Sequence, residues 1–303
     1  MKKIIVSGAT SMIGTALIKA AVQKEIEVYA IVRPDTGRKS RLIESSLIHP
    51  VYGTMDDFKA IDDIPVDCDV FYHFAWSGTS KSDRDNPRIH EQNIKYTLDA
   101  VDFAERCGCC RFIGAGSQAE YGPVNGVIDE ETGFKPLISY GIAKYASGCL
   151  SRKLCEQKGM AHVWGRIFSV YGPHDNAGTM LDYAIKCWEK GETAKFSAGT
   201  QFWNYLFEDD AGQFFFDMGK DNVPSGTYFV ANTESRPLHD YIEIMMKVYG
   251  PAAKAEFAEP AFSNVPGLNV NMNKTLDVLG DRNMVKFEDG IKRMIETRKS
   301  VLS

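Results

Sequence analysis

Short apolar runs alternate with longer amphipathic stretches through the first half of the chain. A run of roughly four to eight apolar residues bounded by turn residues predicts a buried strand, whereas apolar residues at i, i+3, i+4 and i+7 predict a helix. A helix is expected directly after the first strand, where one apolar stripe runs from Ile13 to Ala21, and longer helices are expected at 87–107 and 140–158. We expect strands at residues 2–6, 27–32, 48–53, 70–74, 111–115 and 161–168.

This alternation of strands and helices predicts the fold class. Parallel strands need crossover connections, which are usually helices, so residues 1–170 should form a Rossmann doubly wound parallel sheet with helices on both faces. Beyond Tyr171 prolines separate shorter elements. We therefore expect an α/β protein with a smaller C-terminal domain at 171–303 and with segments from about 203–233 returning to the sheet.

Composition narrows the class of protein. The chain has 303 residues, 44% of them hydrophobic and 25% charged, as expected of a globular protein rather than a disordered one. A net charge of −5 without a dense Lys/Arg run argues against a nucleic-acid partner. Since no apolar segment approaches the roughly 20 residues that span a bilayer, we expect no membrane segment.

The cysteines indicate the compartment. There are seven, an odd number, and they are scattered except for those at 107, 109 and 110. This usage suits a reducing cytoplasm better than a disulfide framework. The cluster lacks a second ligand pair at a usable spacing, so we expect no metal site.

A glycine-rich turn follows the first predicted strand. Small residues there let the backbone approach a pyrophosphate, and the positive end of the following helix favours that anion. The context of strand, turn and helix predicts that 1–170 is an NAD(P)-binding domain and 171–303 a substrate-binding domain. The residues expected to bind the cofactor in this turn are Gly8, Thr10, Ser11, Met12, Ile13 and Gly14.

The end of the second predicted strand bears on the choice of cofactor. An acidic residue there accepts the ribose hydroxyls of NAD, whereas a basic one pairs with the 2′-phosphate of NADP. Arg33 follows this strand, with Arg38, Lys39 and Arg41 close behind, and this charge favours NADP(H) over NAD(H). Asp35 lies nearby and leaves NAD(H) as the alternative.

Three residues form a candidate catalytic site. Tyr140 and Lys144 are four positions apart, so on a helix they share one face. A tyrosine with a pKa near 10 is only about one part in a thousand phenolate at pH 7, and a nearby ammonium would help it to act as a base. Ser117 comes at the end of the fifth predicted strand, the edge at which ligands bind in such sheets. Its hydroxyl could hold the reacting carbonyl or alcohol oxygen against Tyr140.

Together these motifs resemble the extended short-chain dehydrogenase/reductases, in particular their nucleotide-sugar epimerase, dehydratase and 4-ketoreductase group. The resemblance includes the turn at Gly8, the strand end from His73 to Trp76, Asn93, the segment 112–122, Tyr140 with Lys144, and the segment 166–173. It implies that Ser117, Tyr140 and Lys144 are the catalytic residues, and that the protein forms a homodimer through the helices at 87–107 and 140–158. It also implies that the cofactor is lined by Phe74, Ala75, Ile167, Tyr140 and Lys144, with adenine contact at Thr54, Met55 or Asp56.

Several positions depart from the family pattern. Family dehydratases carry Asp and Glu directly after the catalytic Ser or Thr, but this chain has Gln118 and Ala119, which disfavours dehydration. A usual Asn is Ser169, and an Arg that often meets the nucleotide diphosphate is Trp203. Arg236 is a substitute phosphate partner. The residues expected to bind substrate are Trp76, Ser117, Gln118, Ser169, Trp203 and Arg236.

The sequence thus favours an NAD(P)-dependent enzyme that transfers hydride at C4 of a nucleotide-linked sugar, with Tyr140 as acid and base. It leaves open whether the reaction is 4-epimerisation or 4-keto reduction, since both use the same three residues. One alternative is a non-catalytic NAD(P)-binding sensor. Another is a reductase or decarboxylase of a different carbonyl or sugar-acid substrate.

Overall fold

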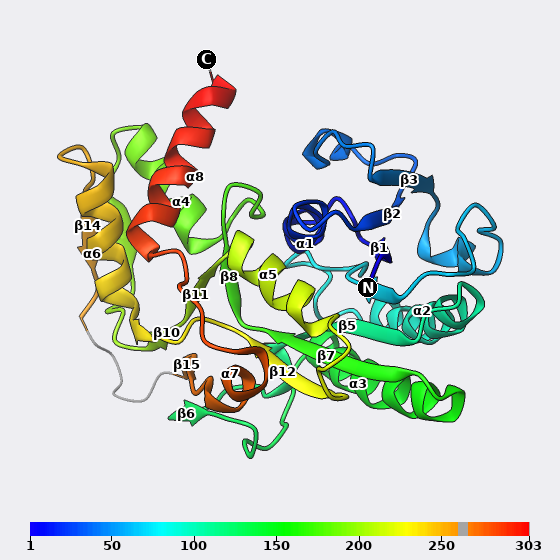
Figure 1. Cartoon of the computed structure of the whole chain (residues 1–303). Helices are drawn as coiled ribbons and strands as arrows, with labels where there is room; N and C mark the ends of the chain where they lie inside the picture. Colours follow the sequence, from blue (N-terminus) through cyan, green and yellow to red (C-terminus); the bar gives the residue numbers. More distant parts are fainter. Residues whose placement is uncertain (260–265, 303) are drawn as a thin grey trace.

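A seven-stranded parallel sheet forms the centre of the molecule (Figure 1). The computed structural model describes residues 1–259 and 266–302. The strand order is β12-β7-β5-β4-β1-β2-β3, and every neighbouring pair is parallel. The strands are β1 (Lys3–Ser7), β2 (Glu27–Val32), β3 (Ile48–Tyr52), β4 (Val70–His73), β5 (Arg111–Ser117), β7 (Ala161–Ile167) and β12 (Gly226–Val230). The predicted doubly wound sheet is confirmed.

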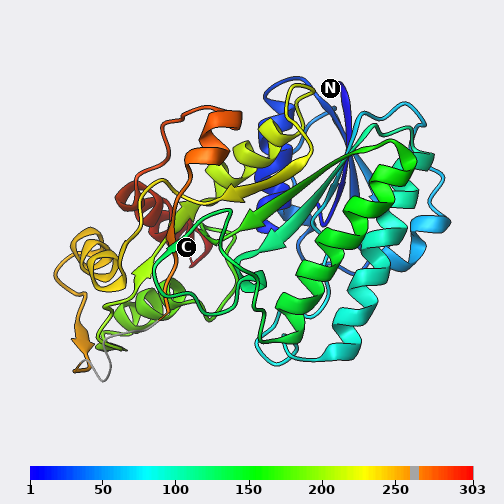
Figure 2. The ribbon, with the colours of Figure 1, turned by 90° about the horizontal axis from the view of Figure 1, so that it is seen from below.

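Helices cover both faces of this sheet. On one face α1 (Met12–Val22) packs against α5 (Glu208–Met218), and on the other α2 (Pro87–Arg106) packs against α3 (Ser139–Lys158), as Figure 2 shows. The two cores follow from the alternation of side chains along β1, where Ile4 faces the α1 side and Ile5 the α2 side. Gly212 lets α5 approach α1 closely, because a Cβ there would lie 2.4 Å from the Ala16 carbonyl carbon.

The C-terminal part contributes a third core. Aromatic side chains of Tyr171, Trp188, Tyr205 and Phe287 are buried together there. Helices α4 (Met180–Glu189), α6 (Leu238–Tyr249) and α8 (Phe287–Leu302) surround this core, and α7 (Asn273–Leu279) packs beside β12 and α5. Short paired strands complete this part: β8 (Ser169–Tyr171) with β11 (Tyr205–Phe207), β9 (Ala194–Phe196) with β14 (Ala255–Phe257), β10 (Phe202–Trp203) with β13 (Arg236–Pro237), and β15 (Asn269–Val270) with β6 (Val127–Ile128).

The predicted elements differ from the observed ones mainly at their ends. The turn expected over 8–14 is shorter than predicted, since α1 already begins at Met12. The strand predicted at 111–115 extends to Ser117. The returning segment contains α5 and β12, of which β12 forms the edge of the sheet beside β7. Three short 3₁₀ helices, η1 (Lys39–Arg41), η2 (Met55–Lys59) and η3 (Gln118–Glu120), lie in connections that the pattern left without assignment.

Across the described residues, no helix combines the length and the apolar character needed to traverse a membrane.

Candidate active site

The carboxyl ends of four neighbouring strands bring the predicted site residues to one edge of the sheet. Ser7 at the end of β1 lies opposite His73 at the end of β4, and Ser117 of β5 lies opposite Ile167 of β7. The glycine turn and the Phe74–Ala75 segment follow strands at the same edge, where Ser117, the predicted catalytic serine, ends β5. This is the edge at which ligands bind in open parallel sheets.

The glycine turn packs tightly against the segment that follows β4. Gly8 has a φ of +72°, and a Cβ on it would lie 2.7 Å from the Ala75 nitrogen. Ser11 caps α1, since its hydroxyl accepts a hydrogen bond from the Gly14 N–H at 3.1 Å. The first turn of α1 carries no acidic side chain. The turn and the helix end thus fit a pyrophosphate, which needs close backbone approach and free N–H groups. Thr10, Met12 and Ile13 are partly exposed along this turn.

Of the charged and polar residues that follow β2 and β3, some have side chains that are hydrogen-bonded to other residues, and the side chain of Arg33 is not, within the described part of the chain. Arg38 donates to the Asn176 side chain at 3.3 Å, and Arg41 donates to the His174 carbonyl at 3.2 Å. Arg33 is exposed, and no side-chain hydrogen bond or ion pair engages it within 1–259 and 266–302. Thr54 is bound through both its N–H and its hydroxyl to the Asp57 carboxylate.

Two further cofactor positions have apolar surroundings. Phe74 packs edge-on against Phe215 of α5, with ring centres 4.7 Å apart, and Met55, the first residue of η2, packs partly buried against the core on the α2 side of the sheet. Ala75 lies against Gly8 of the glycine turn.

Ser117 is held by a buried ion pair beneath it. The Ser117 N–H donates to the Glu120 carboxylate at 2.8 Å, and the Arg166 guanidinium donates to the same carboxylate at 2.8 and 3.0 Å. The Trp164 indole N–H adds a fourth bond to it at 3.0 Å. The Ser117 hydroxyl accepts from the Ala119 N–H at 3.2 Å, which closes a capping box over η3. These four hydrogen bonds occupy the Glu120 carboxylate. Glu120 therefore holds the structure in place and is not free to transfer protons in a dehydration.

Lys144 is buried where α3 faces β5. Its ammonium donates to the Ala115 carbonyl at 2.7 Å and lies 3.6 Å from the Trp76 ring centre. Only 4% of Lys144 is exposed, and this burial lowers its pKa from 10.5 to about 7. The negative charge of Glu120 acts in the opposite direction and raises the pKa, but its effect is smaller. Lys144 is therefore close to its titration point at neutral pH.

Tyr140 lies beside both Ser117 and Lys144. Burial raises the pKa of the Tyr140 phenol, whereas a hydrogen bond from Ser117 and the charge of Arg84 lower that pKa. The Lys144 ammonium lies 5.8 Å from the Tyr140 ring centre. The three predicted catalytic residues are brought together, but the cation closest to the Tyr140 ring is Arg84, whose guanidinium carbon is 4.5 Å from the ring centre. In this structure burial dominates, so the phenol remains protonated near neutral pH.

Two of the predicted substrate residues share a cavity of about 340 Å³. Gln118 and Trp203 line this cavity, the candidate substrate cavity, together with Arg84. Trp203 also donates its indole N–H to the Ser169 hydroxyl at 3.0 Å, so Ser169 contacts the Trp203 ring. Trp76 stands edge-on to Tyr140, with ring centres 6.0 Å apart.

Arg236 differs from the expectation. Its guanidinium is paired with the Glu234 carboxylate through two bonds, at 2.6 and 2.7 Å. A phosphate would have to displace or share that carboxylate, so Arg236 is a weaker phosphate partner than its position in the sequence suggests.

Sequence reasoning missed Arg84 and the partners of Glu120. Arg84 lies between Asp83 and Asp85 in the loop before α2, where charged residues are ordinarily solvated. Arg166 stands inside a buried strand, and a charged residue there is a signal for a buried partner.

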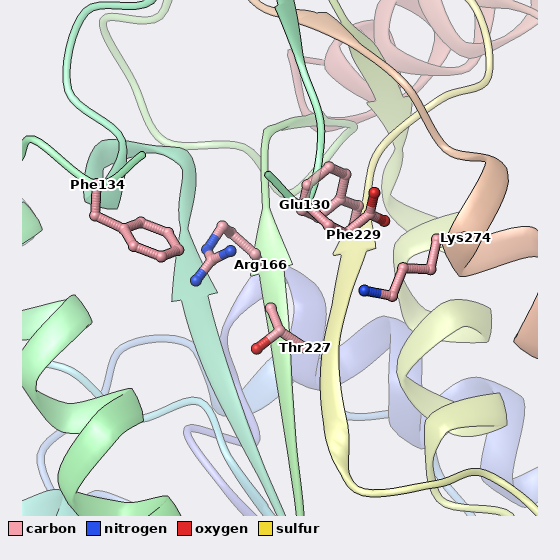
Figure 3. A pocket seen from close by; sticks show the side chains of 6 residues that line it. All are labelled: Glu130, Phe134, Arg166, Thr227, Phe229 and Lys274. Atoms are coloured by element: carbon pink, nitrogen blue, oxygen red, sulfur yellow. The ribbon is translucent and has the colours of Figure 1, made fainter. Parts of the chain in front are cut away.

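A second cavity, of about 240 Å³, lies beside β7 and β12 (Figure 3). Arg166 contributes to its wall, and its guanidinium is held by Glu120 and by the Tyr121 hydroxyl at 2.8 Å. The remaining lining residues are Glu130, Phe134, Thr227, Phe229 and Lys274. No set of three His, Cys, Asp or Glu side chains within the described ranges is arranged to hold a metal ion.

The fold and the site define an NAD(P)-binding Rossmann enzyme of the extended short-chain dehydrogenase/reductase class. The sequence model of the NAD dependent epimerase/dehydratase family matches residues 4–231. The chain belongs to this family.

Curated relatives and solved structures agree with this assignment. The chain is 22% identical to CDP-abequose synthase of Salmonella muenchen over 98% of both chains. It is 21% identical to UDP-glucuronic acid decarboxylase 1 of Arabidopsis thaliana, covering 97% of this chain and 69% of that protein. The fold is similar to that of UDP-glucuronic acid 4-epimerase from Bacillus cereus in complex with NAD, with a TM-score of 0.84, 21% identity and coverage of 99% and 100%.

Proposed function

We propose that the protein transfers hydride at C4 of a nucleotide-linked sugar, as a 4-epimerase or a 4-ketoreductase, with Tyr140 as the acid and base. The observation that carries this proposal is the placement of Tyr140 between the Ser117 hydroxyl and the buried ammonium of Lys144. A sensor that only bound the cofactor would have no need to bury a lysine at this point, because burial penalises its charge.

The mechanism follows from the protonation of these groups. A bound nicotinamide cofactor supplies the hydride chemistry, and the turn from Gly8 to Gly14 would hold its pyrophosphate. Tyr140, which is protonated near neutral pH, donates its proton to the C4 oxygen during reduction and takes it back during oxidation. The Ser117 hydroxyl holds that oxygen and stabilises the phenolate by a hydrogen bond. Lys144 is fixed by Ala115, so its charge acts on the phenol from a constant position.

The cofactor is proposed to be NADP(H). Arg33 is the cation at the end of β2 that no other side chain engages in the described part of the chain, and the 2′-phosphate of NADP is the group that an arginine there would bind. Arg38 and Arg41 are held by residues 174–176 and would contribute less. Ile167 of β7 is paired in register with Ser117 of β5, so it would lie at the nicotinamide end of the cofactor.

The substrate is proposed to enter where the two predicted domains meet. The substrate cavity is lined by eight residues between 84 and 138 from the N-terminal half and by residues 203 and 266–268 from the C-terminal half. Gln118 and Trp203 would contact the sugar there, with Ser169 fixing the Trp203 ring and Trp76 bounding the reacting end. The printed names of the relatives, which refer to CDP- and UDP-linked sugars, support a nucleotide sugar as the substrate.

We also propose a cytoplasmic homodimer. All seven cysteines are free, which supports a reducing compartment. Helix α3 exposes Ile142, Tyr145 and Leu150, and this apolar surface supports pairing of α2 and α3 with those of a second copy.

The experiment that tests the function compares wild type with Tyr140→Phe on a panel of UDP-, dTDP-, CDP- and GDP-linked sugars. Absorbance at 340 nm follows the cofactor, and NMR gives the configuration of the product at C4. We expect the variant to lose about 10²- to 10⁴-fold in rate while its cofactor affinity is retained. Unchanged turnover by the variant would exclude Tyr140 as the acid and base. Product without net cofactor consumption indicates an epimerase, and stoichiometric NADPH oxidation indicates a reductase.

A further inference from the structure

We propose that Arg84 is a specificity residue that binds a carboxylate next to the reacting carbon, so that the substrate is a nucleotide-linked sugar acid. This inference rests on the proposed function and goes further by naming the class of sugar.

Arg84 is a cation without an anionic partner. None of the side chains in 1–259 and 266–300 forms an ion pair with its guanidinium, and its Nε is buried without a hydrogen-bond partner among them. The flanking carboxylates are engaged elsewhere. Asp85 accepts from the N–H and the hydroxyl of Ser139, at 2.9 and 3.0 Å, and Asp83 accepts from the Ser80 hydroxyl at 2.6 Å. Arg84 therefore has no direct anionic partner among the described side chains, and its guanidinium lies over the Tyr140 ring.

The charge of the substrate cavity is set by the same residue. Among the described residues that line it, Arg84 is the only one with a charged side chain, and the others are polar, apolar or glycine. A partly buried guanidinium with a free Nε is disfavoured unless an anion pairs with it, and its planar fork matches a carboxylate through two parallel bonds. The cavity thus selects a ligand with a negative group at this point.

The position of Arg84 distinguishes between the two anionic groups of such a ligand. Its guanidinium carbon is 4.5 Å from the centre of the Tyr140 ring, and its own carbonyl accepts the Tyr140 N–H at 3.0 Å. An anion bound by this guanidinium would therefore lie beside the Tyr140 side chain, and the proposal places it near the carbon whose oxygen Tyr140 would protonate. In a hexopyranose the C6 carboxylate is attached to C5, which is bonded to C4, whereas the diphosphate is attached to C1 across the ring. The carboxylate of a sugar acid is the group within reach.

The experiment measures kcat/KM for sugar acids and for the matching neutral sugars on the same nucleotide, using UDP-glucuronate with UDP-glucose and GDP-mannuronate with GDP-mannose. Wild type, Arg84→Gln and Arg84→Lys are compared. We expect wild type to prefer the acid of at least one pair by tenfold or more. Arg84→Gln should reduce this preference at least tenfold, and Arg84→Lys should retain part of it, because an ammonium keeps the charge without the planar fork.

Arg88→Gln is the matched control. Arg88 lies on the exposed start of α2 in an ion pair with Glu91 at 3.0 Å, and its replacement should leave the preference unchanged. Circular dichroism and cofactor binding verify that each variant folds.

Two results would overturn the inference while leaving the proposed function in place: equal use of acid and neutral sugars by wild type, or a preference that survives in Arg84→Gln. Failure of the proposed function gives a different result, namely wild-type turnover that Tyr140→Phe does not reduce.

Discussion

The Lys144 ammonium is enclosed between the Trp76 ring, 3.6 Å away, and the Ala115 carbonyl, 2.7 Å away. This enclosure fixes the position of the ammonium that we propose supports Tyr140 electrostatically. It also removes the ammonium from water, which disfavours its charged form and lowers the pKa of Lys144 to about 7.

Lys144→Met should therefore stabilise the protein without cofactor and abolish its activity. Between pH 7 and 10.5 the unfolded chain carries a proton on Lys144 that the folded chain does not, so wild-type stability should rise with pH in that window. At pH 7 the variant avoids the cost of burying a charged or deprotonated lysine but loses the hydrogen bond to Ala115. We therefore expect the free energy of unfolding to increase by about 1–3 kcal/mol. Urea unfolding at pH 7 and pH 9.5 measures it. A variant less stable than wild type at pH 7 would contradict this account.

The ion pair beneath Ser117 should be essential for stability. Glu120→Gln leaves the Arg166 charge buried without its partner, and we expect a loss of about 3–5 kcal/mol together with reduced activity. The double variant Glu120→Gln/Arg166→Met should recover much of the stability, since both charges are then removed. Chemical denaturation measures both effects. As a control, Glu91→Gln breaks an exposed pair and should change stability by less than about 1 kcal/mol.

Arg33→Glu should change the choice of cofactor. Replacing the cation by a carboxylate repels the 2′-phosphate and offers an acceptor to the ribose hydroxyls, so the ratio of NADPH to NADH affinity should fall at least tenfold. Fluorescence titration with each cofactor measures this ratio. Arg38→Gln is the control, because its guanidinium is directed to Asn176. A wild-type protein that already binds NADH tenfold more tightly than NADPH would refute the proposed cofactor preference.

Two buried histidines should make the protein sensitive to acid. Burial lowers the pKa of His73 to about 3 and that of His162 to about 4. Below pH 6.5 the unfolded chain binds protons at these positions that the folded chain does not, so stability falls by about 1.4 kcal/mol per pH unit for each histidine. His162→Gln should flatten this slope in urea titrations between pH 6.5 and 4.5. As a control, replacing the partly exposed His49 by Gln should leave the slope unchanged, and equal slopes in wild type and His162→Gln would argue against the effect.

Much of the sheet could be predicted because its strands are buried on both faces. Strands such as Glu27–Val32 are short apolar runs between turn residues, and their limits in the structure match the pattern. The edge strand β12 was expected only as part of a returning segment. Its residues resemble other short apolar stretches of the C-terminal half, and its pairing with β7 depends on contacts distant in sequence.

The site was predictable where chemistry and local spacing coincide, as for Tyr140 and Lys144 on one turn of α3. Arg84 was not predictable in this way, because its approach to Tyr140 depends on how the loop before α2 folds against the start of α3. Trp203 and Gln118, both predicted to bind substrate, line one cavity, whereas the pairing of Arg236 with Glu234 depends on a local geometry that residue types alone do not reveal.

The anchoring of Glu120 constrains how this chain could acquire new chemistry. A mutation that freed its carboxylate to shuttle protons would at the same time release the backbone of Ser117, the residue proposed to position substrate. Water elimination would therefore have to arise from acids introduced at positions 118 and 119, while residue 120 stays as it is. The hydrogen bonds that hold Ser117 in place thus limit which residues beneath the site could take on a new chemical role.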